Sequence, residues 1–255
     1  MATKAEPASI AQELSKALEV LYGSHKTFLE VDPYEISRIR SLIEQLQKVD
    51  RIKADIKTTD LETFFLNYEG AKRAIKNIAA LGGRDEAAST DFRIESNFLN
   101  ATNALGLSAK VISSPGNYGL GTLFMSCMSI GAFQTVVDAV ESANKEQRVI
   151  TNNGCIPIAR KAASVMNRLG VSDAEVAACI DVAGAMLQAR KILWLNQTPD
   201  IHIVGDKEGE PGIAMEFRIP VSAAQASDMT WEWCEKLIDA NLYRAGVTFG
   251  FIGVR

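Results

Sequence analysis

The feature that most constrains this chain is a run of 27 residues, 111–137, without a single charged side chain. Its second part, residues 119–137, is long enough for a helix that crosses a bilayer. However, this part is poor in Leu and Ile, contains several Ser, Thr and Gln residues, and has no flanking cluster of Lys or Arg to set a membrane topology. We therefore predict a helix buried inside the protein or at a subunit contact, and keep a membrane-embedded subunit that spans through 119–137 as an alternative.

The rest of the composition is typical of a globular protein. Hydrophobic residues make up 47% of the 255 residues, charged residues make up 23%, and the net charge is −4. These values exclude collagen-like, disulfide-scaffold, polybasic and intrinsically disordered chains. Because an acidic chain has no basic field to attract nucleic acid, we expect protein partners and no nucleic acid.

The cysteines and histidines indicate neither a metal site nor a disulfide framework. The four cysteines are far apart and form no Cys-x-x-Cys pair, and the chain contains only two histidines. Zinc sites normally need closely spaced pairs of ligands, so we predict no metal and no cofactor. Scattered cysteines are typical of reduced thiols, and the first twenty residues contain five charged side chains instead of the apolar stretch of a secretory signal. We therefore expect a cytoplasmic protein.

The N-terminal part, residues 1–83, is predicted to be a helical hairpin or small bundle. Apolar residues at helical spacing indicate helices over 10–23, 33–56 and 60–81, the third one capped by Thr59 and Asp60. The second helix contains a two-heptad seam that slips near Asp50, formed by Ile36, Ile39, Ile43 and Leu46. This seam is either the core of a self-contained bundle or a coiled coil for a partner, and we favour the bundle.

The middle part, residues 84–146, is predicted to be helical around the uncharged segment. Small and polar residues at 82–90 are typical of a hinge. A helix is expected over 91–105, followed by a short β-like run at 109–113 and then by a glycine-rich loop. The uncharged helix follows this loop and ends near residue 144.

The C-terminal part, residues 147–255, shows the clearest pattern of alternating elements. Strands are predicted at 148–151, 201–204, 213–221 and 247–254, and helices at 157–169, 174–194 and 222–243. The order βααββαβ is that of a ferredoxin-like domain with one extra helix. The sequence therefore predicts an α+β protein: a helical N-terminal unit, and a C-terminal domain with a four-stranded antiparallel sheet and helices on one face.

The glycine-rich loop is the first candidate for chemistry. Gly116, Asn117, Gly119 and Gly121 lie just before a predicted helix, where free backbone N–H groups bind anions. The spacing matches neither the dinucleotide fingerprint nor a P-loop. We therefore favour a flexible turn over a ligand-binding loop.

Cys155 is the second candidate, because it lies where a predicted helix begins. A helix N-terminus lowers the pKa of a thiol, and His202 on a predicted strand is the candidate base for a nucleophilic pair. Most cysteines at such turns are packing residues, and we favour that interpretation.

These patterns together predict a non-enzymatic interaction or assembly subunit, which oligomerises or docks in a larger complex. Its expected contacts are the seam of the second helix, Phe124 and Met128 in the uncharged helix, and Trp231, which falls outside the inward stripe of its helix. The alternative from another class is an anion- or nucleotide-binding enzyme that uses the loop Gly116–Gly121 and a reactive Cys155.

Overall fold

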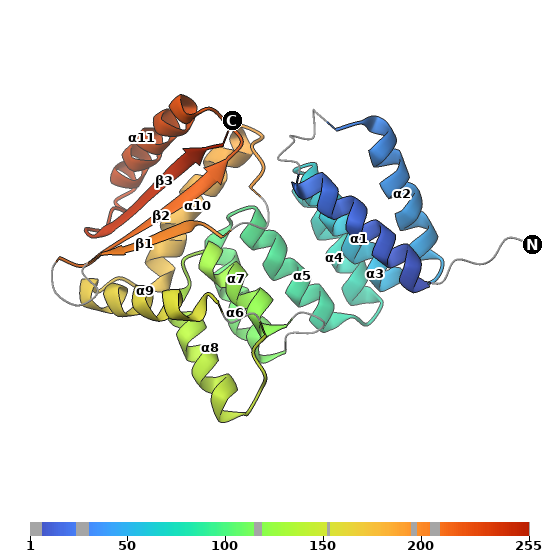
Figure 1. The fold of residues 1–255 in the computed structure, drawn as a ribbon, viewed down its shortest axis with the longest axis horizontal. Coiled ribbons are helices and arrows are strands. Elements are labelled where there is room, and N and C mark those ends of the chain that lie inside the picture. Colours follow the sequence, from blue (N-terminus) through green and yellow to red (C-terminus); the bar gives the residue numbers. More distant parts are fainter. Residues whose placement is uncertain are drawn as a thin grey trace, which may run out of the picture. The chain divides into compact units, whose positions relative to one another are not determined.

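The computed structural model describes residues 7–23, 31–114, 119–151, 154–194, 198–204 and 210–254. These residues form eleven helices and one three-stranded sheet (Figure 1), which confirms the predicted α+β class and adds a helical majority. Internal contacts group the chain into two compact units, residues 1–94 and 95–255. The division into three parts, 1–83, 84–146 and 147–255, stays a prediction.

The first unit is a bundle of amphipathic helices. Helices α1 to α4 pack against one another in sequence order, and their apolar faces form the core. The bundle comprises α1 (Pro7–Gly23), α2 (Pro33–Gln47), α3 (Arg51–Phe64), α4 (Tyr68–Ala80) and the first turns of α5 (Arg84–Asn97).

The bundle contains one helix break more than predicted, and a second break lies at a different place. The predicted helix 33–56 is interrupted at Asp50, whose side chain caps α3 by accepting a hydrogen bond from Lys53 N at 3.0 Å. The cap predicted at Thr59 and Asp60 is wrong, since both residues are buried inside α3. The next helix starts after Asn67, whose side chain accepts a bond from Gly70 N at 3.1 Å. Asp50 and Asn67 therefore each begin a new helix at a position where apolar spacing alone would continue the preceding one.

Two predicted non-helical segments are helical. The polar hinge predicted at 82–90 is mostly the start of α5, whose first turn contains Asp85 and Glu86, where the helix dipole favours acidic side chains. The β-like run predicted at 109–113 belongs to α6 (Ala101–Ser113). There Ala104, Ser108 and Val111 recur at helical spacing and are buried, so the helical period outweighs the β-branched composition.

The uncharged segment is two short helices inside the second unit. α7 (Leu120–Ser129) and α8 (Phe133–Lys145) are separated by a bend at Gly131, which has a φ of 70°. A side chain at Gly131 would collide with Val176 of α10. The glycine therefore lets α10 approach the bend between α7 and α8 closely. In the part of the chain that the structure describes, no helix is long and apolar enough to cross a membrane.

The remaining elements of the second unit surround the sheet. They are α9 (Ile156–Leu169), α10 (Asp173–Ala189), β1 (Asp200–Val204), β2 (Gly212–Ile219), α11 (Ala223–Asp239) and β3 (Val247–Gly253). β1 and β2 form an antiparallel hairpin, and α11 crosses over to β3, which pairs with β2 in parallel. In Figure 1, α10 passes behind the sheet and α11 lies beside β3.

The core of the second unit centres on Trp233 of α11. The Trp233 ring lies 5.1 Å from the Phe249 ring and 4.9 Å from the Phe251 ring, measured between centroids. Its indole N–H donates to the carbonyl of Cys179 in α10 at 3.0 Å. One buried side chain therefore joins α10, α11 and the inner face of the sheet.

The ferredoxin-like detail is not confirmed. Residues 148–151, predicted to be the first strand, have no strand structure, and the Arg148 side chain instead donates to the carbonyl of Ile112 at 3.1 Å. The sheet of the described residues has three strands in the order β1-β2-β3. Because β3 pairs directly with β2, no position remains between these two parallel strands for the inserted strand of a split βαβ arrangement.

Candidate functional site

One face of the sheet is packed against helices and the other is open. Alternation along the strands sends Met215 and Phe217 of β2 into the core. The opposite face consists of side chains that are exposed or half-buried: Asp200, His202, Val204, Ala214, Glu216, Arg218, Thr248, Gly250 and Ile252. The second unit therefore presents a strand surface that its own helices leave uncovered.

A groove of about 490 Å³ runs between this open face and α11. Trp231 forms its rim with a side chain that is 71% exposed, and Glu216 is the one charged residue among those that line it. The hydroxyl of Thr230 accepts a hydrogen bond from Phe251 N at 2.8 Å, which fixes α11 along the free edge of β3. Gly250 opposite Thr230 leaves room above the strand. The groove is thus open, mostly apolar and rigid.

The charges on the open face are paired across the hairpin. Arg218 donates two hydrogen bonds to Oδ2 of Asp200, at 2.9 and 2.8 Å. His202 Nε2 lies 3.1 Å from Glu216 Oε2. Both pairs are exposed to solvent, so they contribute little stability. His202 lies beside Glu216, the charged residue of the groove.

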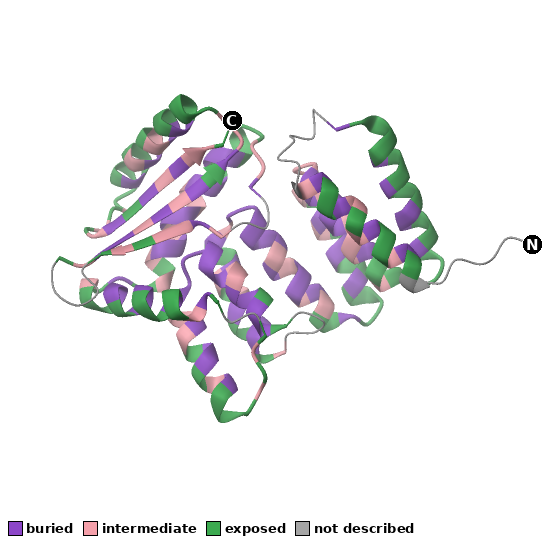
Figure 2. Cartoon of the chain, in the orientation of Figure 1, coloured by how far each residue is buried: buried purple, intermediate pink, exposed green. Residues whose placement is uncertain are grey.

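The outward side of α11 extends the groove into a larger surface. Trp231 and Ile238, seven residues apart on one side of the helix, are 71% and 64% exposed. A line of exposed acidic side chains runs beside them, formed by Asp228, Glu235 and Asp239. We call the groove, the two apolar side chains and the acidic line together the α11 surface. Figure 2 shows its exposed residues along the helix, away from the sheet.

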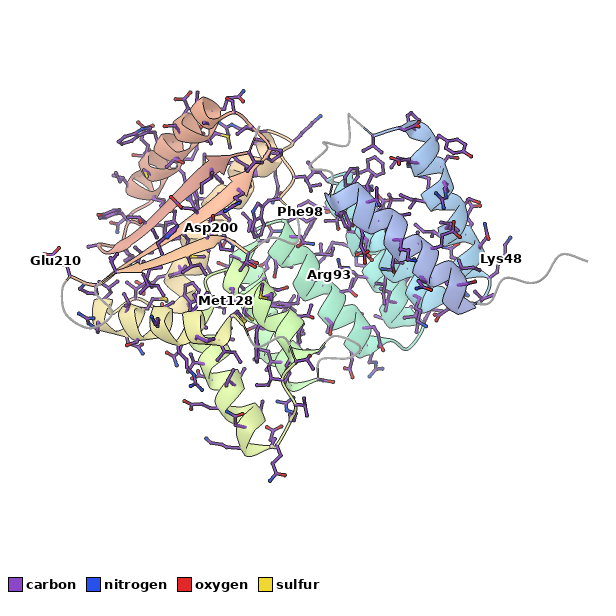
Figure 3. The ribbon with its side chains drawn as sticks, viewed as in Figure 1. Lys48, Arg93, Phe98, Met128, Asp200 and Glu210 are labelled. Carbon is purple, nitrogen blue, oxygen red and sulfur yellow. The ribbon has the colours of Figure 1, made fainter. Side chains whose placement is uncertain are left out.

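Most of the predicted contact residues lie inside the fold. The four seam residues Ile36, Ile39, Ile43 and Leu46 are at most 9% exposed, within the helical bundle. Phe124 and Met128 are fully or almost fully buried, and Met128 lies in the interior of the second unit (Figure 3). The chain itself covers the apolar surface of these six residues, whereas Trp231 remains exposed.

The glycine-rich loop is described only in part. Gly116 and Asn117 lie outside the described residues. Gly119 is the N-cap of α7, and a side chain at this position would lie 3.1 Å from the hydroxyl of Thr151. Gly121 is buried within α7. Gly119 therefore lies beside Thr151 and Gly121 belongs to the helix itself, and the choice between a turn and a ligand-binding loop stays a prediction.

Cys155 and His202 do not form a hydrogen-bonded pair. Cys155 begins α9 as expected, but it is only 6% exposed, and burial raises the pKa of its thiol, whereas a backbone hydrogen bond acts the other way. His202 is exposed and contacts Glu216. A thiol with a raised pKa is mostly protonated near neutral pH and is a poor nucleophile.

Metal binding receives no support from the described side chains. Within residues 7–254, apart from the gaps in the description, no group of three or more His, Cys, Asp or Glu side chains could hold an ion. The acidic line on α11 is solvent-exposed and spread along the helix instead of converging on one point.

Sequence reasoning found Trp231 and missed the rest of the α11 surface. The acidic residues at 228, 235 and 239 were visible as an i, i+7, i+11 pattern beside Trp231 and Ile238. The contribution of Glu216 depends on the strand register, which no local pattern reveals. Comparisons with known protein families, curated protein sequences and solved structures found no match to this chain, so the α11 surface itself is the basis for assigning a function.

Proposed function

We propose that the protein is a non-enzymatic interaction subunit, which assembles with another protein through the α11 surface. The observation that supports this function best is Trp231. Its indole is 71% exposed on a well-packed helix, while Trp233 two residues later is fully buried. Tryptophan is enriched among the residues that dominate binding energy at protein interfaces.

The energetic gain from covering this side chain is substantial. An aromatic side chain buries about 150–250 Å² when it is enclosed, and burial contributes about 25 cal/mol per Å². Covering the exposed part of Trp231 therefore supplies about 3–4 kcal/mol before the costs of association. This is a large share of the free energy of a micromolar complex, which is about 8 kcal/mol.

The α11 surface is also preorganised. Ser222 and Gln225 form a capping box at the start of α11, and Glu232 on the helix pairs with Arg190, the residue that follows α10. Together with the contacts of Thr230 and Trp233, these bonds hold the helix in place before a partner arrives. A rigid helix loses little conformational entropy on binding.

The cysteines support the expected cytoplasmic location. All four are free thiols, and three of them are buried. Free thiols are typical of proteins in a reducing compartment.

The function is tested by removing the anchor. Trp231→Ala should abolish association of the protein, measured by native mass spectrometry of the pure chain and by cross-linking in a lysate of its source. Tyr34→Ala is the matched control, because Tyr34 is an aromatic side chain with 75% exposure on α2. A protein that stays monomeric at high concentration and cross-links to no partner would contradict the proposal, as would a Trp231→Ala variant that associates like the wild type.

A further inference from the structure

Two helices of the second unit have opposite charge. α9 contains three basic residues and no acidic residue, whereas α11 contains four acidic residues and one lysine. The basic residues of α9 are exposed and lie on one side of the helix: Arg160, Lys161 and Arg168. The side chain of Ile158 beside them is 41% exposed. The cationic side of α9 is therefore the chemical complement of the α11 surface.

The two helices do not meet within one chain. α9 contacts β1 and β2, whereas α11 packs along β3 at the other end of the strand order. Figure 1 shows α9 and α11 separated by the sheet. Among the described residues, Arg160 makes no ion pair, and neither do Asp228, Glu235 and Asp239. Their complementary charges are thus available for contact between molecules.

We propose that the α11 surface binds α9 of a second copy of this chain. This inference rests on the proposed function and names its partner. The lengths match, since 14 residues of α9 and 17 residues of α11 extend about 21 Å and about 25 Å at 1.5 Å per residue. The guanidinium of Arg160 stacks on the exposed indole of Trp231, and the acidic line of α11 faces the basic side of α9.

The contact joins two different surfaces of the same chain. A two-fold axis that repeats it twice gives a closed dimer, and a rotation of higher order gives a closed ring. In both cases every α9 and every α11 surface is occupied. The charge pattern also gives the contact a direction, because two α11 surfaces, or two α9 helices, repel each other.

The test uses two charge-reversed variants of the full chain. One variant is Asp228→Lys with Glu235→Lys on α11, and the other is Arg160→Glu with Arg168→Glu on α9. Each variant alone places like charges against each other, so its dissociation constant should rise at least tenfold. An equal mixture of the two should associate again, because opposite charges meet in both contacts of a mixed dimer. In one contact the basic α11 of the first variant meets the acidic α9 of the second, and the other contact keeps the wild-type pair.

The readout is the mass distribution in native mass spectrometry and sedimentation velocity, with circular dichroism to verify that each variant is folded. Glu44→Lys with Glu69→Lys, two exposed positions in the first unit, changes the net charge as much as the α11 variant does and should leave association unchanged. If the α11 variant fails to fold, Asp228→Asn with Glu235→Gln replaces it, with a smaller but same-direction effect.

The outcomes separate this inference from the proposed function. Restored association in the mixture, weakened by added salt as charged surfaces require, supports the α9 partner. A wild-type chain that stays monomeric, single variants that associate normally, or a mixture that stays monomeric overturns it. If Trp231→Ala still abolishes binding to a different protein in the lysate, the proposed function stands while the second copy is excluded as the occupant.

Discussion

The carboxylate of Asp173 caps the helix that contains Thr135. Its Oδ2 atom accepts hydrogen bonds from both the backbone N–H and the hydroxyl of Thr135, each at 2.8 Å, and Oδ1 accepts one from Gln134 N at 3.1 Å. Asp173 is itself the first residue of α10. A single side chain, 38 residues away in the sequence, thus satisfies the free N–H groups at the start of α8 and joins α8 to α10.

Replacing this carboxylate should destabilise the second unit. Asp173→Ala leaves two backbone N–H groups without their acceptor, and loss of a helix cap costs about 0.5–2 kcal/mol. We expect a decrease of about 1–2 kcal/mol in the free energy of unfolding, measured by urea denaturation. Glu141→Gln, an exposed carboxylate on the same helix, is the control and should change stability by less than about 0.5 kcal/mol. Equal stability of the two variants would contradict the capping role.

Gly184 is required where α10 passes the chain at Phe98 and Leu99. A side-chain carbon at Gly184 would lie 2.5 Å from the carbonyl oxygen of Leu99 and 2.8 Å from that of Phe98. Because the obstacle is backbone, it cannot rotate away, so Gly184→Ala should cost about 1–3 kcal/mol. Gly106 in α6 is the matched control, since its surroundings are empty within 4 Å.

The same substitution should therefore have opposite signs at these two positions. Gly106→Ala removes backbone entropy from the unfolded chain without a steric penalty and should stabilise the protein by about 0.5–1 kcal/mol. Thermal denaturation of the two variants beside the wild type measures the difference. A stabilised Gly184→Ala variant would show that α10 does not approach the 98–99 bend so closely.

The local signals in the sequence located one helix start correctly and misplaced another, the cap predicted at Thr59 and Asp60. The capping box at Ser222 and Gln225 predicted the start of α11 correctly, because its residues are three apart. The slip of the seam at Asp50 contained the true helix break, but it was interpreted as a change of register instead of a cap. Proline and capping side chains act locally, so they are readable from sequence when they are given more weight than apolar spacing.

The sheet and the α11 surface show what the sequence could not reveal. Residues 148–151 have strand-like composition, yet they find no neighbouring strand and stay irregular. Strand pairing depends on distant residues, as does the arrangement that brings Glu216 to the groove beside Trp231. The open side of the sheet therefore became visible only in three dimensions, whereas the exposure of Trp231 was predictable from helical geometry alone.

Glu175 links stability to pH. Its pKa is lowered to about 2, first by the hydrogen bond from the backbone N–H of Ser172 and then by Arg244, whose Nε lies 2.8 Å from Glu175 Oε1. A lowered pKa means that the folded state favours the carboxylate. The stabilisation is therefore complete above pH 4.5, the ordinary pKa, and is lost as the pH falls toward 2.

Glu175→Gln isolates this contribution, because glutamine keeps the shape of the capping box. The side chain is partly exposed, so we expect a loss of only about 1 kcal/mol at pH 6, and a difference from the wild type that vanishes near pH 2. Urea denaturation of both proteins between pH 6 and pH 2, together with Arg244→Gln and the double variant, measures the coupling. A difference that is independent of pH would contradict the role of the charge.

The thiols provide a direct comparison between the interaction subunit and the enzyme alternative. Burial raises the pKa of Cys155, and it also raises the pKa of Cys179 to about 11, whereas Cys234 on α11 is half-buried and borders the α11 surface. At pH 7.5 iodoacetamide should therefore modify Cys234 first, and Cys155 should react more slowly than a free thiol, because the thiolate is the reactive form. Peptide mapping by mass spectrometry identifies the modified residue, and Cys234→Ser should remove the fast phase that Cys155→Ser leaves intact. A Cys155 that reacts faster than free cysteine would instead indicate an activated nucleophile and favour the enzyme.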